Sequence, residues 1–183
     1  MAKHKDSTYH FILEKALEVV VESGAAKLTF DAVAHKSGIS RGGILYHFPN
    51  KEAMLESLLE YYVGMEMSVF LKHWEKLGSS PSTMTKAEVL SMREKEGKKR
   101  DIAIALLASL VHHPALLQKI RPLVEQRFKT IVNNPNFAKE AIILMALDGM
   151  YTMHALGLEP LSAKQRQEIF NCMLSLCDQK DVK

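Results

Sequence analysis

Residues 29–51, TFDAVAHKSGISRGGILYHFPNK, constrain the fold more than any other stretch of the chain. The small Ala34 lets a following helix cross closely over its own, and Gly38 can take the left-handed conformation that ends a helix. Ile39 then supplies an apolar side chain at the corner, and the Ser40 hydroxyl can accept a backbone N–H bond at the next helix start. This spacing predicts two short helices joined by a tight turn, as in a helix-turn-helix, whose second helix lies in the DNA major groove.

The same stretch resembles the N-terminal domain of the tetracycline-repressor (TetR) family of bacterial one-component regulators. The resemblance covers residues 7–60, and the remainder resembles the family only in its length and its helical character. The positions that carry it are Thr29, Val33, Ala34, Gly38, Ile39, Ser40, Gly42, Tyr46, His47, Phe48, Lys51, Glu52 and Leu55.

The resemblance implies a homodimeric, sequence-specific DNA-binding regulator, and most often a repressor that a small-molecule effector releases from a palindromic operator. The implied fold is all-α, with about nine helices once the helical periodicity of the rest is added. We expect a helix-turn-helix DNA-binding domain in residues 1–52 and a helical regulatory and dimerisation domain in residues 53–183. Neither the operator sequence nor the identity of the effector can be read from the residues.

Candidate DNA contacts lie on the second helix of the motif and beside it. Arg41 is the candidate base reader because arginine can bind guanine through two hydrogen bonds; a simple phosphate contact is the alternative. Two glycines in the first helical turn, at about 1 kcal/mol each in helix propensity, suggest that a bulky partner such as DNA approaches the backbone there. By resemblance, Tyr46 and His47 grip phosphates, and the following helix start supplies another phosphate site. The predicted DNA-binding residues are Thr29, Ser40, Arg41, Gly42, Gly43, Tyr46, His47 and Lys51.

Net charge permits nucleic-acid binding without requiring it. The chain carries +3 overall, and residues 1–51 hold seven Lys or Arg against five Asp or Glu. No apolar run reaches the ~18 residues of a membrane helix, and the first ten residues lack the apolar core of a signal peptide. We therefore expect a cytoplasmic protein without a membrane partner.

Chemistry-bearing motifs are missing from the sequence. There is no glycine-rich phosphate loop, no nucleophile elbow and no Cys/His cluster with metal-ligand spacing, so we expect neither enzyme activity, nor a cofactor, nor a metal. Cys172 and Cys177 are interpreted as two buried thiols, with a disulfide or redox switch as the lesser alternative. The rival classes are a helical protein-interaction module and a small helical ligand carrier or enzyme, neither of which would bind an operator.

Periodicity and capping signals place the remaining helices. Capping boxes are expected at Thr85–Glu88 and Ser162–Gln165, and Pro122 should kink or split its helix. Asn134 is expected to cap a helix that begins at Pro135. In the motif's second helix, Ile44, Leu45 and Phe48 are expected in the core. The expected helices are 7–23, the two of the motif, 51–77, 85–96, 101–113, 114–132, 135–156 and 162–177.

The last two helices are apolar around more of their circumference than one buried stripe requires. Two copies could bury the surplus as a four-helix bundle, the dimer arrangement that the TetR resemblance also implies. A single buried helix in a monomer is the alternative. The candidate interface residues are Ile142, Met145, Ala146, Gly149, Met153, Ile169, Met173 and Leu176.

By resemblance, the effector would bind among the middle helices, within residues 54–130. The Met, Phe and Trp content there favours an apolar or aromatic molecule, although core packing explains the same residues equally well. The candidate ligand-binding residues are Met65, Phe70, Trp74, Leu106 and Phe128.

Overall fold

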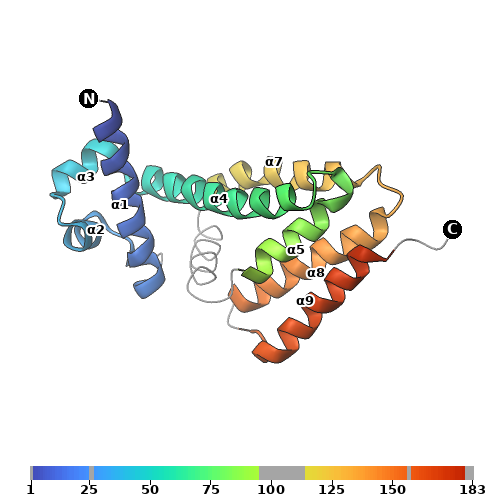
Figure 1. The fold of residues 1–183 in the computed structure, drawn as a ribbon. Helices are drawn as coiled ribbons and strands as arrows, with labels where there is room; N and C mark the ends of the chain where they lie inside the picture. The colour runs from blue at the N-terminus through green and yellow to red at the C-terminus, as the bar shows by residue number, and fades with distance from the viewer. Residues whose placement is uncertain (1, 25–26, 95–113, 156–157, 180–183) are drawn as a thin grey trace.

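The elements of regular secondary structure are all helices in the part of the chain that the computed structural model describes, residues 2–24, 27–94, 114–155 and 158–179 (Figure 1). The expected helix 101–113, with Leu106, lies outside these residues, as does the basic turn at residues 97–100. The helices are α1 (Ala2–Ser23), α2 (Phe30–Ser37), α3 (Arg41–His47), α4 (Lys51–Lys76), α5 (Met84–Glu94), α7 (Pro114–Ile131), α8 (Phe137–Ala155) and α9 (Ala163–Asp178). Figure 1 shows a small head, formed by α1, α2 and α3, at one end of the long helix α4, and a body that contains α5, α7, α8 and α9 toward the other end.

The head has its own apolar core, to which α1, α2, α3 and the first half of α4 all contribute. α1 begins at Ala2, five residues before the expected start at residue 7, because no helix-breaking residue interrupts that stretch. The buried side chains are Ile12, Leu13, Ala16, Leu17, Val19, Val20, Leu28, Val33, Ile44, Phe48, Met54, Leu55, Leu58 and Leu59.

α4 belongs to the head and the body at once. Its first turns bury Met54, Leu55 and Leu58 in the head core, and its second half packs against α5. Asn50 caps it, with Asn50 Oδ1 accepting from the Ala53 N–H at 2.7 Å. α7 runs beside this helix, and Lys119 Nζ lies 2.9 Å from Glu56 Oε2. The head is therefore tied to the body through one rigid element and its neighbour.

The body core lies where α5, α7, α8 and α9 meet. α8 buries one face of its apolar run here and leaves the opposite face exposed. The buried residues are Val89, Ile131, Ala141, Ile143, Leu144, Leu147, Phe170 and Met173.

Two local expectations for the body are wrong, and a third is wrong in part. Thr85 caps nothing: α5 begins at Met84 after the 3-10 turn η2 (Pro81–Thr83), and the Thr85 hydroxyl donates to Glu140 Oε2 at 3.0 Å. Pro122 does not split its helix, because α7 continues through this exposed residue, where solvent can satisfy the carbonyl that loses its N–H partner. α8 begins at Phe137 because Asn134 folds the preceding residues into a turn and accepts from the Phe137 N–H through its carbonyl.

The capping box at Ser162–Gln165 is confirmed, with both the Ser162 side chain and the Gln165 side chain in their capping roles. The interpretation of the two cysteines holds only in part. Both are free, but Cys172 is exposed, and only Cys177 is partly buried, which raises the pKa of its thiol to about 11.

No helix within the described ranges is long and apolar enough to cross a membrane. Within the same ranges, no three His, Cys, Asp or Glu side chains come together as a metal site.

Candidate functional site

The turn between α2 and α3 has the geometry that the sequence predicts. Thr29 Oγ1 accepts from the Ala32 N–H at 3.1 Å and caps α2. Gly38 ends α2 in the left-handed conformation (φ 72°), and its N–H donates to the Ala34 carbonyl at 2.9 Å. Ile39 packs against the head core. The apolar corner and the helix end together fix the angle at which α3 leaves α2.

α3 is held by one face and presents the other to solvent. Ser40 Oγ accepts from the Gly43 N–H at 3.1 Å, while Ile44 and Phe48 are fully buried. Leu45 is not in the core, contrary to expectation; 39% of it is exposed. The reason is helical geometry: positions four apart share a face, and the intervening residue points about 100° away. An exposed leucine on a candidate reading helix can contact a thymine methyl group.

The two glycines of α3 have different surroundings. A Cβ atom on Gly43 would lie 2.9 Å from Ile39 Cγ2, so the turn itself leaves no room for a side chain. A Cβ atom on Gly42 would meet nothing within 4 Å. Packing therefore accounts for Gly43, whereas Gly42 leaves an open strip of helix backbone on the exposed side.

Aromatic rings brace the C-terminal end of α3. Tyr46 is 69% exposed, and its ring stands edge-on to that of His47 at 5.3 Å. Tyr9 of α1 stacks on Phe48 at 5.0 Å and lies 6.1 Å from the His47 ring. Tyr9 is thus a positioning residue that the sequence analysis missed, because only the fold brings α1 beside the end of α3.

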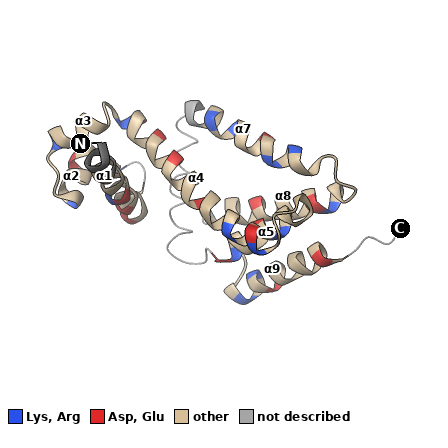
Figure 2. Cartoon of the chain, turned by 45° about the horizontal axis from the view of Figure 1, so that its top comes forward, with Lys and Arg blue, Asp and Glu red and all other residues tan. Residues whose placement is uncertain are grey.

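Positive charge near α3 is sparse. The guanidinium of Arg41 lies 3.6 Å from Asp31, and both side chains are largely exposed, so this pair is weak and open to exchange. Lys36 instead bonds Glu22 on α1 at 2.7 Å, and this hydrogen bond raises its pKa. Lys51 opens α4, where the helix N-terminus adds favourable dipoles for an anion. Figure 2 shows Lys and Arg spread along the chain and not gathered on α2 and α3.

The candidate ligand residues do not share one place. Phe70 lines a cavity of about 410 Å³ between α4, α5 and α7. Met65 lines a separate hollow between α1 and α4. Trp74 stacks on Phe70 and donates through Nε1 to the Ser80 carbonyl at 2.9 Å. Phe128 packs against the body core, and Leu106 lies outside the described residues.

The candidate dimer residues divide into an exposed and a covered set. Ile142, Met145, Gly149 and Met153 are exposed and follow one another along one side of α8, with Ile142 67% and Met145 64% accessible. Ala146, Ile169 and Leu176 are half-buried against the body core, and Met173 is buried in it. The exposed set forms an apolar stripe on the outside of the body.

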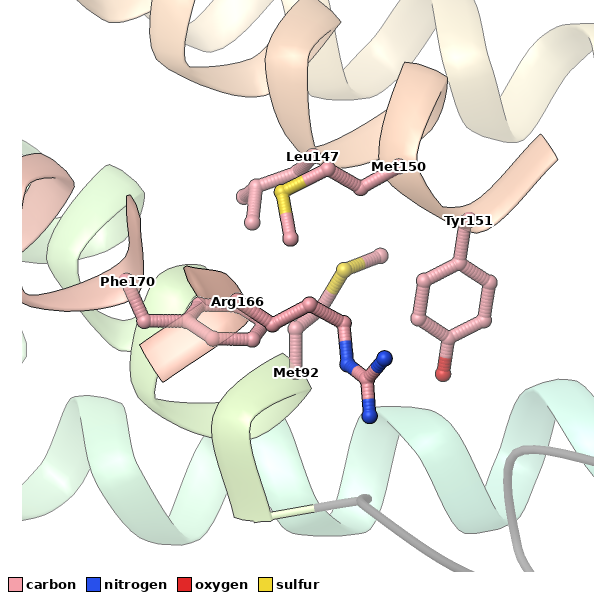
Figure 3. A pocket seen from close by; sticks show the side chains of 6 residues that line it. All are labelled: Met92, Leu147, Met150, Tyr151, Arg166 and Phe170. Atoms are coloured by element: carbon pink, nitrogen blue, oxygen red, sulfur yellow. The ribbon is translucent and has the colours of Figure 1, made fainter. Parts of the chain in front are cut away.

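A second hollow, where α5, α8 and α9 meet, is too small for a ligand (Figure 3). Its volume is about 10 Å³, the size of a single water. Figure 3 shows the Arg166 side chain extending toward the Tyr151 ring across this hollow. Arg166 Nη1 donates to the Leu161 carbonyl at 3.0 Å and lies 3.3 Å from Glu159, so this cluster joins the ends of α8 and α9.

Two family profiles match this chain. One, described as "Tetracyclin repressor-like, C-terminal domain", matches residues 82–178, more than half of the chain. The other, described as "Bacterial regulatory proteins, tetR family", matches residues 12–58. The second match covers α2, α3 and every candidate DNA contact from Thr29 to Lys51.

Individual proteins match this chain at low sequence identity. YerO, an uncharacterized HTH-type transcriptional regulator of Bacillus subtilis (strain 168), is 32% identical over 97 residues, which are 52% of this chain and 34% of YerO. The match thus spans about a third of that relative's length. The multidrug binding protein EbrR, solved with imidazole, has a TM-score of 0.68 at 18% identity, over 91% of this chain and 89% of that one. A proposed regulator from Streptomyces coelicolor A3(2) has a TM-score of 0.67 at 17% identity, over 93% and 98%. These two structures show a shared fold.

Proposed function

Since this chain belongs to the TetR family of helix-turn-helix transcriptional regulators, we propose that it acts as a homodimeric repressor that a small molecule releases from a palindromic operator. The observation that carries this proposal is the outer face of α3. That face offers Arg41, Leu45 and Tyr46 to solvent beside the bare backbone of Gly42. A helix held rigidly from behind and furnished with donors in front suits the major groove.

Each contact has a distinct role in this proposal. Arg41 leaves its weak pair with Asp31 and binds a guanine edge, while Leu45 contacts a thymine methyl group. Tyr46 and His47 donate to phosphates on one side of the groove. Lys51 and the N-terminus of α4 bind phosphate on the other side. Thr29, Ser40 and Gly43 support these contacts by fixing the turn, and their own backbone lies close to the duplex.

The dimer is proposed from the exposed stripe on α8. Contiguous apolar surface of this kind is unusual on a monomer, and a two-fold axis lets one stripe cover its own copy. The dimer would set the spacing between the two α3 helices, and thereby the spacing of the operator half-sites.

The cavity between α4, α5 and α7 is the proposed effector site. A ligand that fits one arrangement of α4 better than another would shift the distance between the two heads. The shared fold with EbrR, described as a multidrug binding protein, supports a ligand-binding body. Since its target is DNA, we place the protein in the cytoplasm.

The decisive experiment is selection of genomic fragments by the purified protein, followed by sequencing of the bound pool. Tyr46→Ala serves as the control because its side chain is exposed and its loss should leave the fold intact. A palindrome that is enriched by the wild type and lost with Tyr46→Ala supports the proposal. A well-folded dimer that enriches no sequence contradicts it.

Variants at three positions separate base reading from phosphate binding. We expect Tyr46→Ala and Lys51→Ala to weaken binding to all sequences alike, whereas Arg41→Ala should also relax sequence preference by about 1–3 kcal/mol at one base pair. The measurement is binding to the operator and to single-base variants at fixed salt. Equal effects of all three variants on every sequence would remove Arg41 from the reading role.

A further inference from the structure

The cavity between α4, α5 and α7 has mostly apolar walls, and its volume of about 410 Å³ lies within the range of small-molecule sites. Residues from all three helices contribute to it, so a ligand inside would contact the helix that joins head and body. The apolar lining residues are Val63, Met67, Phe70, Met84, Met92, Ile120, Leu123 and Val124.

The side chains that line the cavity carry more negative than positive charge. Among the described lining residues, the charged ones are Glu66, Glu88 and Arg127. Arg127 is held on both sides, by Glu88 at 2.5 Å and by Asp148 at 2.9 Å. Burial alone would lower the pKa of Arg127, but these two carboxylates raise it above its ordinary value. Its positive charge is therefore already more than balanced within the protein.

An anionic ligand would meet an unfavourable environment in this cavity. It would have to displace Glu88 or Asp148 from Arg127, leaving a carboxylate without its partner at a partly buried position. A cation meets the opposite situation, because the lining carboxylates outnumber the one guanidinium. The sign of the wall charge thus selects for a positive ligand.

Two tyrosines influence the surroundings of Glu66. Tyr62, one turn earlier on α4, interacts electrostatically with Glu66 and with Tyr151 of α8. Burial, together with Tyr151 and Glu66, keeps the pKa of Tyr62 far above its usual range, so this phenol remains a donor. A neutral Tyr62 adds no charge to this wall, so Glu66 is the carboxylate that lines the cavity from α4.

Ser91 adds a polar group to the wall that α5 forms. Its side chain lines the cavity on α5, only 2% of the residue is accessible, and its hydroxyl has no hydrogen-bond partner among the described residues. A buried hydroxyl without a partner costs free energy that a bound ligand can recover.

We propose that this cavity binds a lipophilic cation, an aromatic or aliphatic body carrying one ammonium-type group that bonds Glu66 and Ser91. The inference rests on the proposed function only in naming this molecule as the effector. The binding preference itself concerns the cavity alone and can be measured without DNA.

Three probes with one aromatic body and three charges test this preference: 1-naphthylmethylammonium, 1-naphthylmethanol and 1-naphthylacetate. Their dissociation constants for the full-length protein are measured by titration calorimetry. We expect the cation to bind about tenfold or more tightly than the alcohol, and the anion to bind most weakly.

Variants locate the binding. Glu66→Gln should weaken the cation about tenfold and leave the alcohol unchanged, since only the charge is removed. Glu75→Gln is the matched control, because Glu75 lies on the same helix, is exposed and lies outside the cavity lining. Ser91→Ala should weaken both the cation and the alcohol while leaving the thermal midpoint of the free protein unchanged or higher.

The possible results test the cation site and the proposed repressor function separately. Equal affinity for the three probes, a preference for the anion, no binding of any probe, or a Glu66→Gln variant that still prefers the cation overturns the cation site. A cation that binds as expected but leaves operator binding unchanged supports the site and contradicts its role as effector site. Release of the operator by the anion alone contradicts the cation site and leaves the repressor intact.

Discussion

Gly43 lies in the first turn of α3, where a Cβ atom would come within 2.9 Å of Ile39 Cγ2. That methyl group belongs to a β-branched side chain with little rotamer freedom, so it cannot easily move aside. Gly42, its neighbour, has open space where a side chain would be. The internal turn therefore requires only one of the two glycines, and the other is available to a partner outside the chain.

We expect Gly42→Ala to keep or raise stability by up to about 1 kcal/mol, since alanine is the better helix former, and yet to weaken operator binding. Gly43→Ala should lower stability by about 1–3 kcal/mol, the usual scale of overpacking. Thermal unfolding and operator binding are measured on both variants. Operator affinity of Gly42→Ala equal to that of the wild type would mean that DNA does not approach this backbone.

Glu140 is a buried carboxyl, 6% accessible, that accepts from Thr85 and Asn134. Desolvation raises its pKa, with the Thr85 hydrogen bond acting in the opposite direction. A folded-state pKa above the unfolded value stabilises the fold below the unfolded pKa, and this contribution disappears as pH rises through the folded pKa. At neutral pH the charged carboxylate therefore weakens the body.

We expect Glu140→Gln to raise the free energy of unfolding at pH 7 by something on the order of 1 kcal/mol, and this gain should shrink toward about pH 4. Denaturant titrations at the two pH values measure it. Exposed Glu168→Gln on α9 is the control that should change neither value. A variant that is less stable than the wild type at pH 7 would show that the charged form is the favoured one.

At the scale of elements, α4 contributes to three different parts of the molecule along its length. Its N-terminus is the proposed phosphate site, its first turns complete the head core, and its second half forms a wall of the cavity. Lys119 on α7 holds the same helix near the head through Glu56 and Glu60. A ligand between α4 and α7 would therefore act on the element that carries the head.

The cap of α4 gives a test that separates stability from DNA binding. Asn50→Asp keeps the capping oxygen and adds a negative charge that the helix N-terminus favours, so stability should hold or rise by about 0.3–1 kcal/mol. The same charge should repel a phosphate and weaken binding to every DNA sequence. Thermal unfolding and affinity for operator and random DNA are measured together. Unchanged DNA affinity would place the duplex away from the start of α4.

At the scale of the whole molecule, the exposed stripe of α8 is an apolar surface on the outside of the body, where Ile142, Met145 and Met153 are each more than half exposed. The opposite face of the same helix fills the body core with Ile143, Leu144 and Leu147. A helix with two apolar faces is stable in water only when the second face is also covered.

We expect Met145→Lys to convert the protein from a dimer to a monomer of 20.6 kDa, because a charge would be buried without a partner in the interface. Light scattering after gel filtration gives the mass. Leu117→Lys on α7 is the matched control, since Leu117 is an exposed apolar residue on another helix than the stripe. A Met145→Lys dimer would place the interface elsewhere.

The sequence by itself determined the helix-turn-helix, because its features depend on residues a few positions apart. The Thr29 cap, the left-handed Gly38 and the Ser40 cap are local, as is the capping box at Ser162. Local capping and backbone preference act within one turn and survive in any surroundings.

Only the tertiary structure decided the contacts between residues that lie far apart in the sequence. Thr85 resembles a cap in sequence, but α5 begins before it, and its hydroxyl donates to the Glu140 carboxylate, 55 residues later. Likewise, the sequence shows that Arg127 is positively charged, but not that Glu88 and Asp148 both contact it. With these two carboxylates, the net charge around Arg127 is negative. Leu45 is apolar like a core residue, but it is exposed because the head core covers the other face of α3. The cavity and its charge result from helix packing, which no pattern within a single helix specifies.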